Sequence, residues 1–310
     1  MDTVERYRHF ADHEAAGVSP TYEALAIAVA GQPDLIERID TLSWGHRQPN
    51  LLLATSAFLD APLTDPDSYV HWLRDDWDRV APIMATRYTQ TNEAARCATL
   101  LPVLAQLPQP LALLEVGASA GLCLYPDKYS YEYNGVPVGD PRSPVRLECA
   151  ATGPVPIPKR PPEVVWRAGI DLNPIDVTDP DDLAWLTALI WPEHDHRRER
   201  LRAAAAVVAT DPPTLIAGDL VTELPRLAAQ APADATLVVF HSAVMAYLPK
   251  SARDAFTEQV TDLPGHWIAN ETAPEGAAIP GLRPQPFGLR LDGSMVALTG
   301  PHGQAIHWLK

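Results

Sequence analysis

A glutamate followed by a loop of small residues is the part of this chain best suited to chemistry. Glu115 lies in the apolar run Leu111–Val116, and the loop Gly117-Ala118-Ser119-Ala120-Gly121 comes next. Small residues let a backbone pass close to a ligand. A carboxylate just before the loop repels a pyrophosphate, but it accepts hydrogen bonds from a sugar or a cationic amino acid. This charge pattern favours S-adenosylmethionine over NAD or ATP. The expected contacts are Glu115, Gly117, Ala118, Ser119 and Gly121.

The same loop has two other interpretations. It is compatible with a plain turn between a strand and a helix. It also resembles the nucleophile elbow of an α/β-hydrolase, with Ser119 at the central position of G-A-S-A-G. Asp219 and His241 follow in the usual order of such a triad, whereas Glu115 would disfavour a developing oxyanion.

Polar residues also follow three later apolar runs. Asp171 follows Val164–Ile170, Asp219 follows Thr214–Gly218, and His241 follows Leu237–Phe240. We expect Asp171 to hold the two ribose hydroxyls, and Asp219 to receive the adenine amino group with Leu220 beside the ring. His241 is expected to contact the cofactor. The alternatives are helix caps for both aspartates and a core histidine for His241.

Methyl transfer needs alignment above all, and a base helps when the acceptor carries a proton. His241 and Glu93 are the candidate bases. Asn92 and Arg96, one helical turn apart, are candidates for orienting a carboxylate or amide of the substrate. A helix cap for Asn92 and a surface i,i+3 pair between Glu93 and Arg96 remain open. No metal site is expected, because consecutive side chains of Glu193-His194-Asp195-His196 diverge on a helix.

The elements that must position these residues change character near residue 108. Residues 1–108 predict only helices, among them 4–14, 20–30, 35–42, 50–58, 67–80 and one from residue 91 or 92 to 107. Residues 109–310 alternate strands and helices and end in an antiparallel hairpin, which predicts an α/β fold with a mostly parallel, doubly wound sheet. A β-hairpin and a proline-rich loop are expected as an insertion at about 125–163, placed to form a substrate lid.

Composition limits the partners. The net charge of −15 argues against nucleic acid, and the three cysteines are too few and too scattered for a disulfide framework or zinc knuckle. The charged N-terminus lacks a signal core, and no apolar run approaches the roughly 20 residues of a membrane span. We expect a cytoplasmic protein that acts on a small molecule.

Several segments together resemble known families. The glycine loop, the acid after the second strand, Gly218-Asp219-Leu220 and the terminal hairpin look like a Rossmann-like class I S-adenosylmethionine-dependent methyltransferase. The segments Gly169-Ile170-Asp171-Leu172-Asn173-Pro174 and Phe240-His241-Ser242-Ala243-Val244 resemble an uncharacterised bacterial domain-of-unknown-function family, number two-three-three-two, assigned to that superfamily. The resemblance implies a methyltransferase with S-adenosylmethionine as cofactor. A serine hydrolase using Ser119 and an S-adenosylmethionine-binding protein without transfer activity remain the alternatives.

Overall fold

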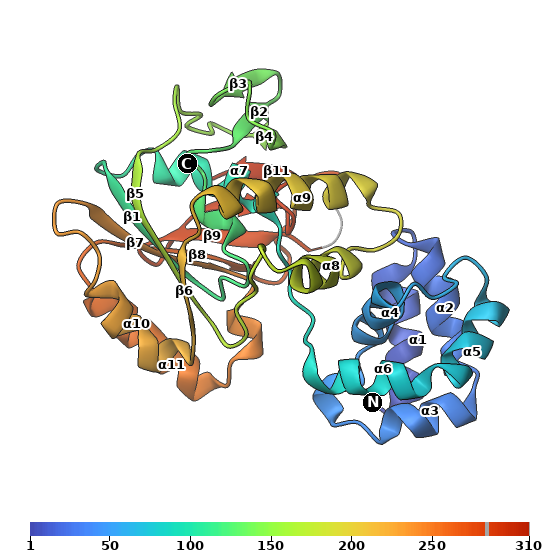
Figure 1. Ribbon diagram of the computed structural model, residues 1–310. Coiled ribbons are helices and arrows are strands. Elements are labelled where there is room, and N and C mark those ends of the chain that lie inside the picture. Colours follow the sequence, from blue (N-terminus) through green and yellow to red (C-terminus); the bar gives the residue numbers. More distant parts are fainter. Residues whose placement is uncertain (283–284, 310) are drawn as a thin grey trace. The chain divides into compact units, whose positions relative to one another are not determined.

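The computed structural model describes residues 1–282 and 285–309 (Figure 1). The chain forms two compact units. Unit 1 comprises residues 1–91 and 178–199, and unit 2 comprises residues 92–177 and 200–310. The sequence instead predicts one boundary at residue 108. Within the described residues, no helix has the length and apolar character needed to cross a bilayer.

Unit 1 is built from helices. A proline stands at the first position of several, where its missing N–H costs no intrahelical hydrogen bond. The predicted helix 67–80 is in fact two helices that meet at Asp76. The elements are α1 (Thr3–His9), η1 (Phe10–Ala15), α2 (Pro20–Ala30), α3 (Pro33–Asp40), η2 (Trp44–His46), α4 (Pro49–Phe58), α5 (Pro66–Asp75), α6 (Trp77–Thr86), α8 (Pro180–Ala188) and the start of α9 (Asp195–Thr210).

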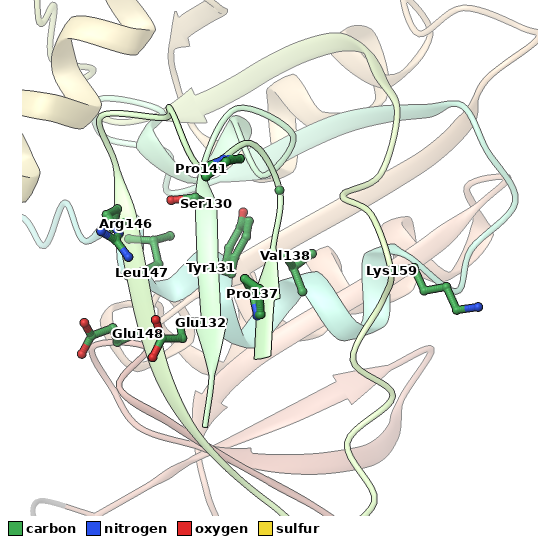
Figure 2. A pocket seen from close by; sticks show the side chains of 11 residues that line it. Ser130, Tyr131, Glu132, Pro137, Val138, Pro141, Arg146, Leu147, Glu148 and Lys159 are labelled. Atoms are coloured by element: carbon green, nitrogen blue, oxygen red, sulfur yellow. The ribbon is translucent and has the colours of Figure 1, made fainter. Parts of the chain in front are cut away.

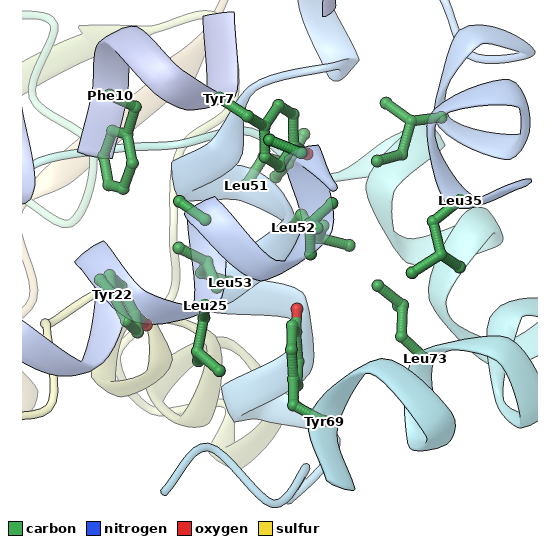
Figure 3. Packing of buried hydrophobic residues seen from close by; sticks show 14 of the residues in the cluster. Tyr7, Phe10, Tyr22, Leu25, Leu35, Leu51, Leu52, Leu53, Tyr69 and Leu73 are labelled. Carbon is green, nitrogen blue, oxygen red and sulfur yellow. The ribbon is translucent and has the colours of Figure 1, made fainter. Parts of the chain in front are cut away.

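Buried aromatic and aliphatic side chains hold unit 1 together (Figure 3). Tyr7, Tyr22 and Tyr69 lie inside this cluster, and Trp185 of α8 joins it although it is distant in the sequence. Burial of large side chains is the main source of stability in such a core. The packing of Trp185 therefore explains why residues 178–199 group with residues 1–91.

Unit 2 contains an eleven-stranded mixed sheet with the order β3-β2-β4-β11-β10-β9-β8-β7-β1-β5-β6 within the described residues. Strands β6, β5, β1, β7 and β8 are parallel, and β8 to β11 form an antiparallel meander. The strands are β1 (Leu111–Val116), β2 (Ser130–Tyr133), β3 (Val136–Val138), β4 (Arg146–Thr152), β5 (Val164–Asp171), β6 (Thr214–Ala217), β7 (Thr236–Ser242), β8 (His266–Thr272), β9 (Phe287–Leu291), β10 (Ser294–Thr299) and β11 (Ala305–Trp308).

The strand order reverses between β1 and β7. Chain order runs outward from β1 through β5 to β6 on one side, and from β7 to β8 on the other. Ligands of doubly wound sheets bind at the carboxyl ends of the strands beside such a reversal. Helices α10 (Leu220–Ala228) and α11 (Lys250–Asp262) lie side by side and cover one face, where Leu114, Val116 and Phe256 are buried.

Short helices precede and follow the strands at this edge. They are η3 (Ala94–Arg96), α7 (Cys97–Leu104), η4 (Leu122–Leu124) and η5 (Met245–Tyr247). The predicted helix from residue 91 or 92 to 107 begins later, as η3 followed by α7. The glycine loop leads into the three-residue η4, so no long helix starts there.

Residues 125–163 contribute strands to the sheet itself. Asn134 and Gly135 turn the chain between β2 and β3 with φ of 50° and 85°. Strand β4, which the sequence analysis missed, pairs in parallel with both β2 and β11. The segment expected as a substrate lid therefore extends the sheet beyond β11.

Candidate functional site

Three of the expected acids lie along one rim of the sheet. Glu115, Asp171 and Asp219 are at the carboxyl ends of β1, β5 and β6, which are adjacent parallel strands. Glu115 pairs in register with Gly169, so Asp171 lies two residues farther toward the carboxyl end of its strand.

The glycine loop uses its own N–H groups. Those of Gly117 and Ala118 donate to the carbonyl of Ile170 (2.8 and 3.1 Å), and that of Gly121 donates to the carbonyl of Ala118. The backbone N–H of Ser119 donates to Asp171 Oδ2, and the backbone N–H of Ala120 donates to Asn92 Oδ1, both at 2.8 Å. A phosphate-binding loop offers free N–H groups to its ligand. This loop offers none.

Gly117 has a steric reason to be glycine. Its φ is +70°, and an added Cβ would lie 2.4 Å from Cγ2 of Val244 in the loop after β7. Such a distance is a severe clash, and positive φ is also unfavourable for residues with a side chain. The glycine therefore allows the loops after β1 and β7 to pack together.

Asn92 orients the glycine loop. Besides accepting from Ala120, its Nδ2 donates to Ser119 Oγ at 2.5 Å. It is not the expected cap of a long helix, because Glu93 is the residue that caps η3. The side chains of Asn92 and Ser119 are therefore in contact, and their hydrogen bonds stabilise the conformation of the glycine loop.

Asp171 links β5 to the same loop. Its Oδ2 accepts from the N–H of Ser119, and its Oδ1 accepts from the N–H of Asn173 at 2.8 Å. These contacts fix the carboxylate at the rim, beside the glycine loop.

Glu115 is a buried carboxyl that lacks hydrogen bonds. Only 6% of the residue is exposed, and its Oε2 has no partner within the described chain. Burial raises the pKa of Glu115 well above its ordinary value; Cys123 and Asp171 add to the rise, and Arg96 opposes it. An unsatisfied buried polar group costs about 1–3 kcal/mol. Such a cost is typical of a group kept for binding.

Asp219 caps a helix, and Leu220 packs in the core. Asp219 Oδ1 accepts from the N–H groups of Val221 and Thr222 and caps α10. Leu220 is buried among the apolar side chains under α10 and α11, so it does not face the rim. Leu172, directly after Asp171, is 76% exposed and is the apolar side chain available there.

Glu93 is buried in a bidentate ion pair. It is 4% exposed, and its two oxygens accept from Nε and Nη2 of Arg200 at 2.8 and 3.1 Å. Oε1 also accepts from the N–H of Ala95. A carboxylate held by an arginine is a poor proton acceptor, so this geometry does not favour Glu93 as a base.

His241 faces the opposite side of the sheet from Glu115. It is fully buried, and its ring packs against those of Phe256 and Trp267. Its Nδ1 lies 2.6 Å from Glu271 Oε1, and its Nε2 has no partner within the described chain. His241 lies at the carboxyl end of β7, one residue beyond the register partner of Glu115, but its side chain is on the other face of the sheet. This orientation does not favour its expected contact with the cofactor or its role as a base.

Glu271 is a residue that the sequence analysis missed. Its Oε1 also accepts from the N–H groups of Val244 (2.9 Å) and Met245 (3.3 Å). Partial burial raises the pKa of Glu271, but the hydrogen bonds from His241 and from these N–H groups outweigh it, so the net pKa is lowered. His241 and Glu271 thus fix the loop that packs against Gly117.

The geometry around Ser119 lacks the partners of a hydrolase. Ser119 has a φ of +49° and is buried, but its hydroxyl contacts Asn92. Within the described residues it makes no hydrogen bond to a histidine, and His241 is bound to Glu271 rather than to Asp219. The N–H of Ala120, which would stabilise an oxyanion, already donates to Asn92.

A separate pocket of about 260 Å³ lies on β2, β3 and β4 (Figure 2). Glu132 and Glu148 are register partners there, and their carboxylates lie side by side. The pocket is lined by Ser130, Tyr131, Glu132, Pro137, Val138, Gly139, Pro141, Arg146, Leu147, Glu148 and Lys159. None of the residues expected to form the site lines it.

Comparison with protein families gives one match over almost the whole chain. Residues 4–308 match the family described as "Uncharacterized protein conserved in bacteria (DUF2332)". The chain belongs to this family. No curated protein and no solved structure matched the chain. For this member of the DUF2332 family, the rim of the sheet is therefore the basis for a functional proposal.

Proposed function

We propose that this protein binds S-adenosylmethionine at the carboxyl ends of β1 and β5 and transfers its methyl group to a small molecule. The observation that carries the proposal is the unsatisfied carboxyl of Glu115, buried beside the glycine loop at the reversal of strand order. The sequence resemblance to Rossmann-like class I methyltransferases supports the same assignment.

The loop argues against a phosphate-bearing ligand. Its five N–H groups are all used within the protein, and Asp171 adds negative charge at the rim, which Glu115 increases when it ionises. A pyrophosphate would meet repulsion there without donors to offset it. An adenosyl group joined to a sulfonium and an amino acid avoids this repulsion, because it carries no phosphate and has positive charge.

The rim residues fit the parts of that ligand. Asp171 would accept hydrogen bonds from the ribose hydroxyls, each contributing about 1.5–3 kcal/mol. Glu115 would accept from the ammonium group of the methionyl part. The exposed side chain of Leu172 would contact the adenine ring, in place of Leu220.

When bound, S-adenosylmethionine supplies a methyl group on a positive sulfur, and the sulfur leaves as a neutral thioether when the acceptor takes the methyl. Neither Glu93 nor His241 is placed as a base at the rim. We therefore assign the catalytic contribution of this chain to orientation, which accounts for about 7–11 kcal/mol of barrier in well-aligned reactions. Asn92 supports that alignment by holding the loop.

Thermal-shift measurements test the ligand class. The melting temperature should rise with S-adenosylmethionine and S-adenosylhomocysteine, and remain unchanged with ATP or NAD at the same concentrations. A rise with ATP or NAD alone would contradict the proposal. Incubation with methyl-labelled S-adenosylmethionine and a metabolite extract then separates a methyltransferase from a binding protein, because only the enzyme moves label into a new compound.

A further inference from the structure

Arg96 is a buried cation without a carboxylate partner. It is 6% exposed, and its Nε and Nη1 donate to the carbonyls of Pro301 (2.9 Å) and Ser242 (3.2 Å). Its guanidinium lies 5.8 Å from the centre of the Phe287 ring. Within the described chain, Arg96 forms no ion pair, and its Nη2 makes no hydrogen bond.

A buried arginine without a carboxylate partner is energetically unfavourable. Burying a charge is costly unless it is paired, and a guanidinium has five N–H donors of which the two carbonyls use two. The remaining donors match a carboxylate, which arginine binds through parallel hydrogen bonds. Arg167 of β5, whose side chain is 8% exposed, has such a partner: its Nη2 lies 2.7 Å from Asp127 Oδ2.

Glu115 presents the complementary case. It is equally buried, its Oε2 has no partner, and it forms no ion pair with Arg96. The two groups lie at the carboxyl ends of neighbouring strands, because Glu115 is the register partner of Phe240 and Arg96 donates to the carbonyl of Ser242, two residues farther along β7. Burial raises the pKa of Glu115, and the positive charge of Arg96 opposes that rise. The site thus holds a buried carboxyl and a buried guanidinium that form no ion pair with each other within the described residues.

We propose that Arg96 and Glu115 together hold an α-amino acid group, with the carboxylate on Arg96 and the ammonium on Glu115. The group has two sources. It is the methionyl end of S-adenosylmethionine, in which case the inference rests on the proposed function, or it is a free amino acid that serves as the acceptor. The chemistry of recognition is the same for both.

Calorimetric titration of two nucleosides tests the first source. S-adenosylhomocysteine carries the amino acid group, and 5′-methylthioadenosine has the same nucleoside thioether without it. We expect wild-type protein to bind S-adenosylhomocysteine about 10- to 100-fold more tightly. Arg96→Met should reduce this ratio by about tenfold without changing the affinity for 5′-methylthioadenosine, because only the contact of Glu115 with the ammonium group remains. Arg96→Lys, which keeps the charge but loses the planar fork, should give an intermediate ratio.

Arg167→Met is the matched control, because it removes an arginine of similar burial that already has a carboxylate partner. It should lower the melting temperature and leave the ratio of the two affinities unchanged. Because the ratio compares two ligands on the same folded protein, a loss of stability in Arg96→Met does not mimic the expected result.

The outcomes separate this inference from the proposed function. Equal affinity of the wild type for both nucleosides would exclude the methionyl end as the source and leave nucleoside binding intact. A wild-type preference for S-adenosylhomocysteine that persists unchanged in Arg96→Met would overturn the role of Arg96. If the two affinities are equal, or if neither nucleoside binds and the proposed function fails, thermal shifts with the free amino acids test the second source. A shift lost in Arg96→Met supports a free amino acid as the source, and no shift overturns the inference.

Discussion

The substitution Glu115→Gln should stabilise this protein at neutral pH. The side chain keeps its shape but no longer ionises, so folding at neutral pH no longer requires this buried carboxyl to take up a proton or to be buried as an anion. Burial, aided by Cys123 and Asp171 against Arg96, raises the pKa of Glu115 in the folded state. For a carboxyl with a raised folded-state pKa, its contribution to stability is fully present below the unfolded pKa of about 4.3 and is lost as the pH rises toward the folded value.

The magnitude follows from the one proton that the wild type must take up on folding and the variant need not. In that pH window, the stability of the wild type relative to Glu115→Gln should fall by up to about 1.4 kcal/mol per pH unit. At pH 7 the free energy of unfolding of the variant should therefore be about 1–3 kcal/mol higher than that of the wild type. For a domain of this size, this corresponds to about 2–4 °C in melting temperature per kcal/mol.

Glu93→Gln is the control for this experiment. Glu93 is as buried as Glu115, but its oxygens are satisfied by Arg200. Breaking a buried ion pair costs about 3 kcal/mol or more, so this variant should be less stable than the wild type at pH 7. Melting temperatures of the three proteins at pH 4, 5.5 and 7 give the comparison. If Glu115→Gln destabilises the protein at pH 7 as Glu93→Gln does, our account of Glu115 is wrong.

Three further results are expected. Glu271→Gln should lower the free energy of unfolding by about 1–3 kcal/mol at pH 7. Burial raises the folded-state pKa of Glu271, but the hydrogen bond from His241 outweighs it, so the pKa is lowered and the loss should shrink as the pH falls through the folded-state pKa; a difference that stays constant as the pH is lowered would contradict this. Gly117→Ala should lower the melting temperature, because its Cβ would lie 2.4 Å from Val244, and an unchanged melting curve would show that the two loops do not pack as described. A fluorophosphonate should leave Ser119 unlabelled in peptide mass spectra, whereas an adduct at Ser119 would support the hydrolase alternative.

The central strands could be predicted because each is a short apolar run. Residues 111–116, 164–170 and 236–240 were expected as strands and correspond to β1, β5 and β7. β4 was not predicted, since it alternates exposed and buried residues and pairs with β11, more than 150 residues away. The helix expected over 67–80 is interrupted at Asp76, where no proline or glycine marks the break.

The positions of the candidate site residues were easier to predict than their contacts. A polar residue after an apolar run predicts a place at the rim, and Glu115 and Asp171 lie there. The alternation of side chains along β7 could have indicated that His241 faces α11. The contacts of Arg96 with Ser242 and Pro301 join residues 146 and 205 positions apart, which no local pattern reveals.

Calorimetric titration of S-adenosylhomocysteine into the wild-type protein and into Asp171→Ala tests the central claim most directly. The claim predicts saturable binding at one site per chain in the wild type. It also predicts loss of that binding in Asp171→Ala, which removes the ribose acceptor and the contact with Ser119. Absence of binding to the wild type, or equal affinity for the two proteins, would contradict the placement of the nucleoside at the ends of β1 and β5.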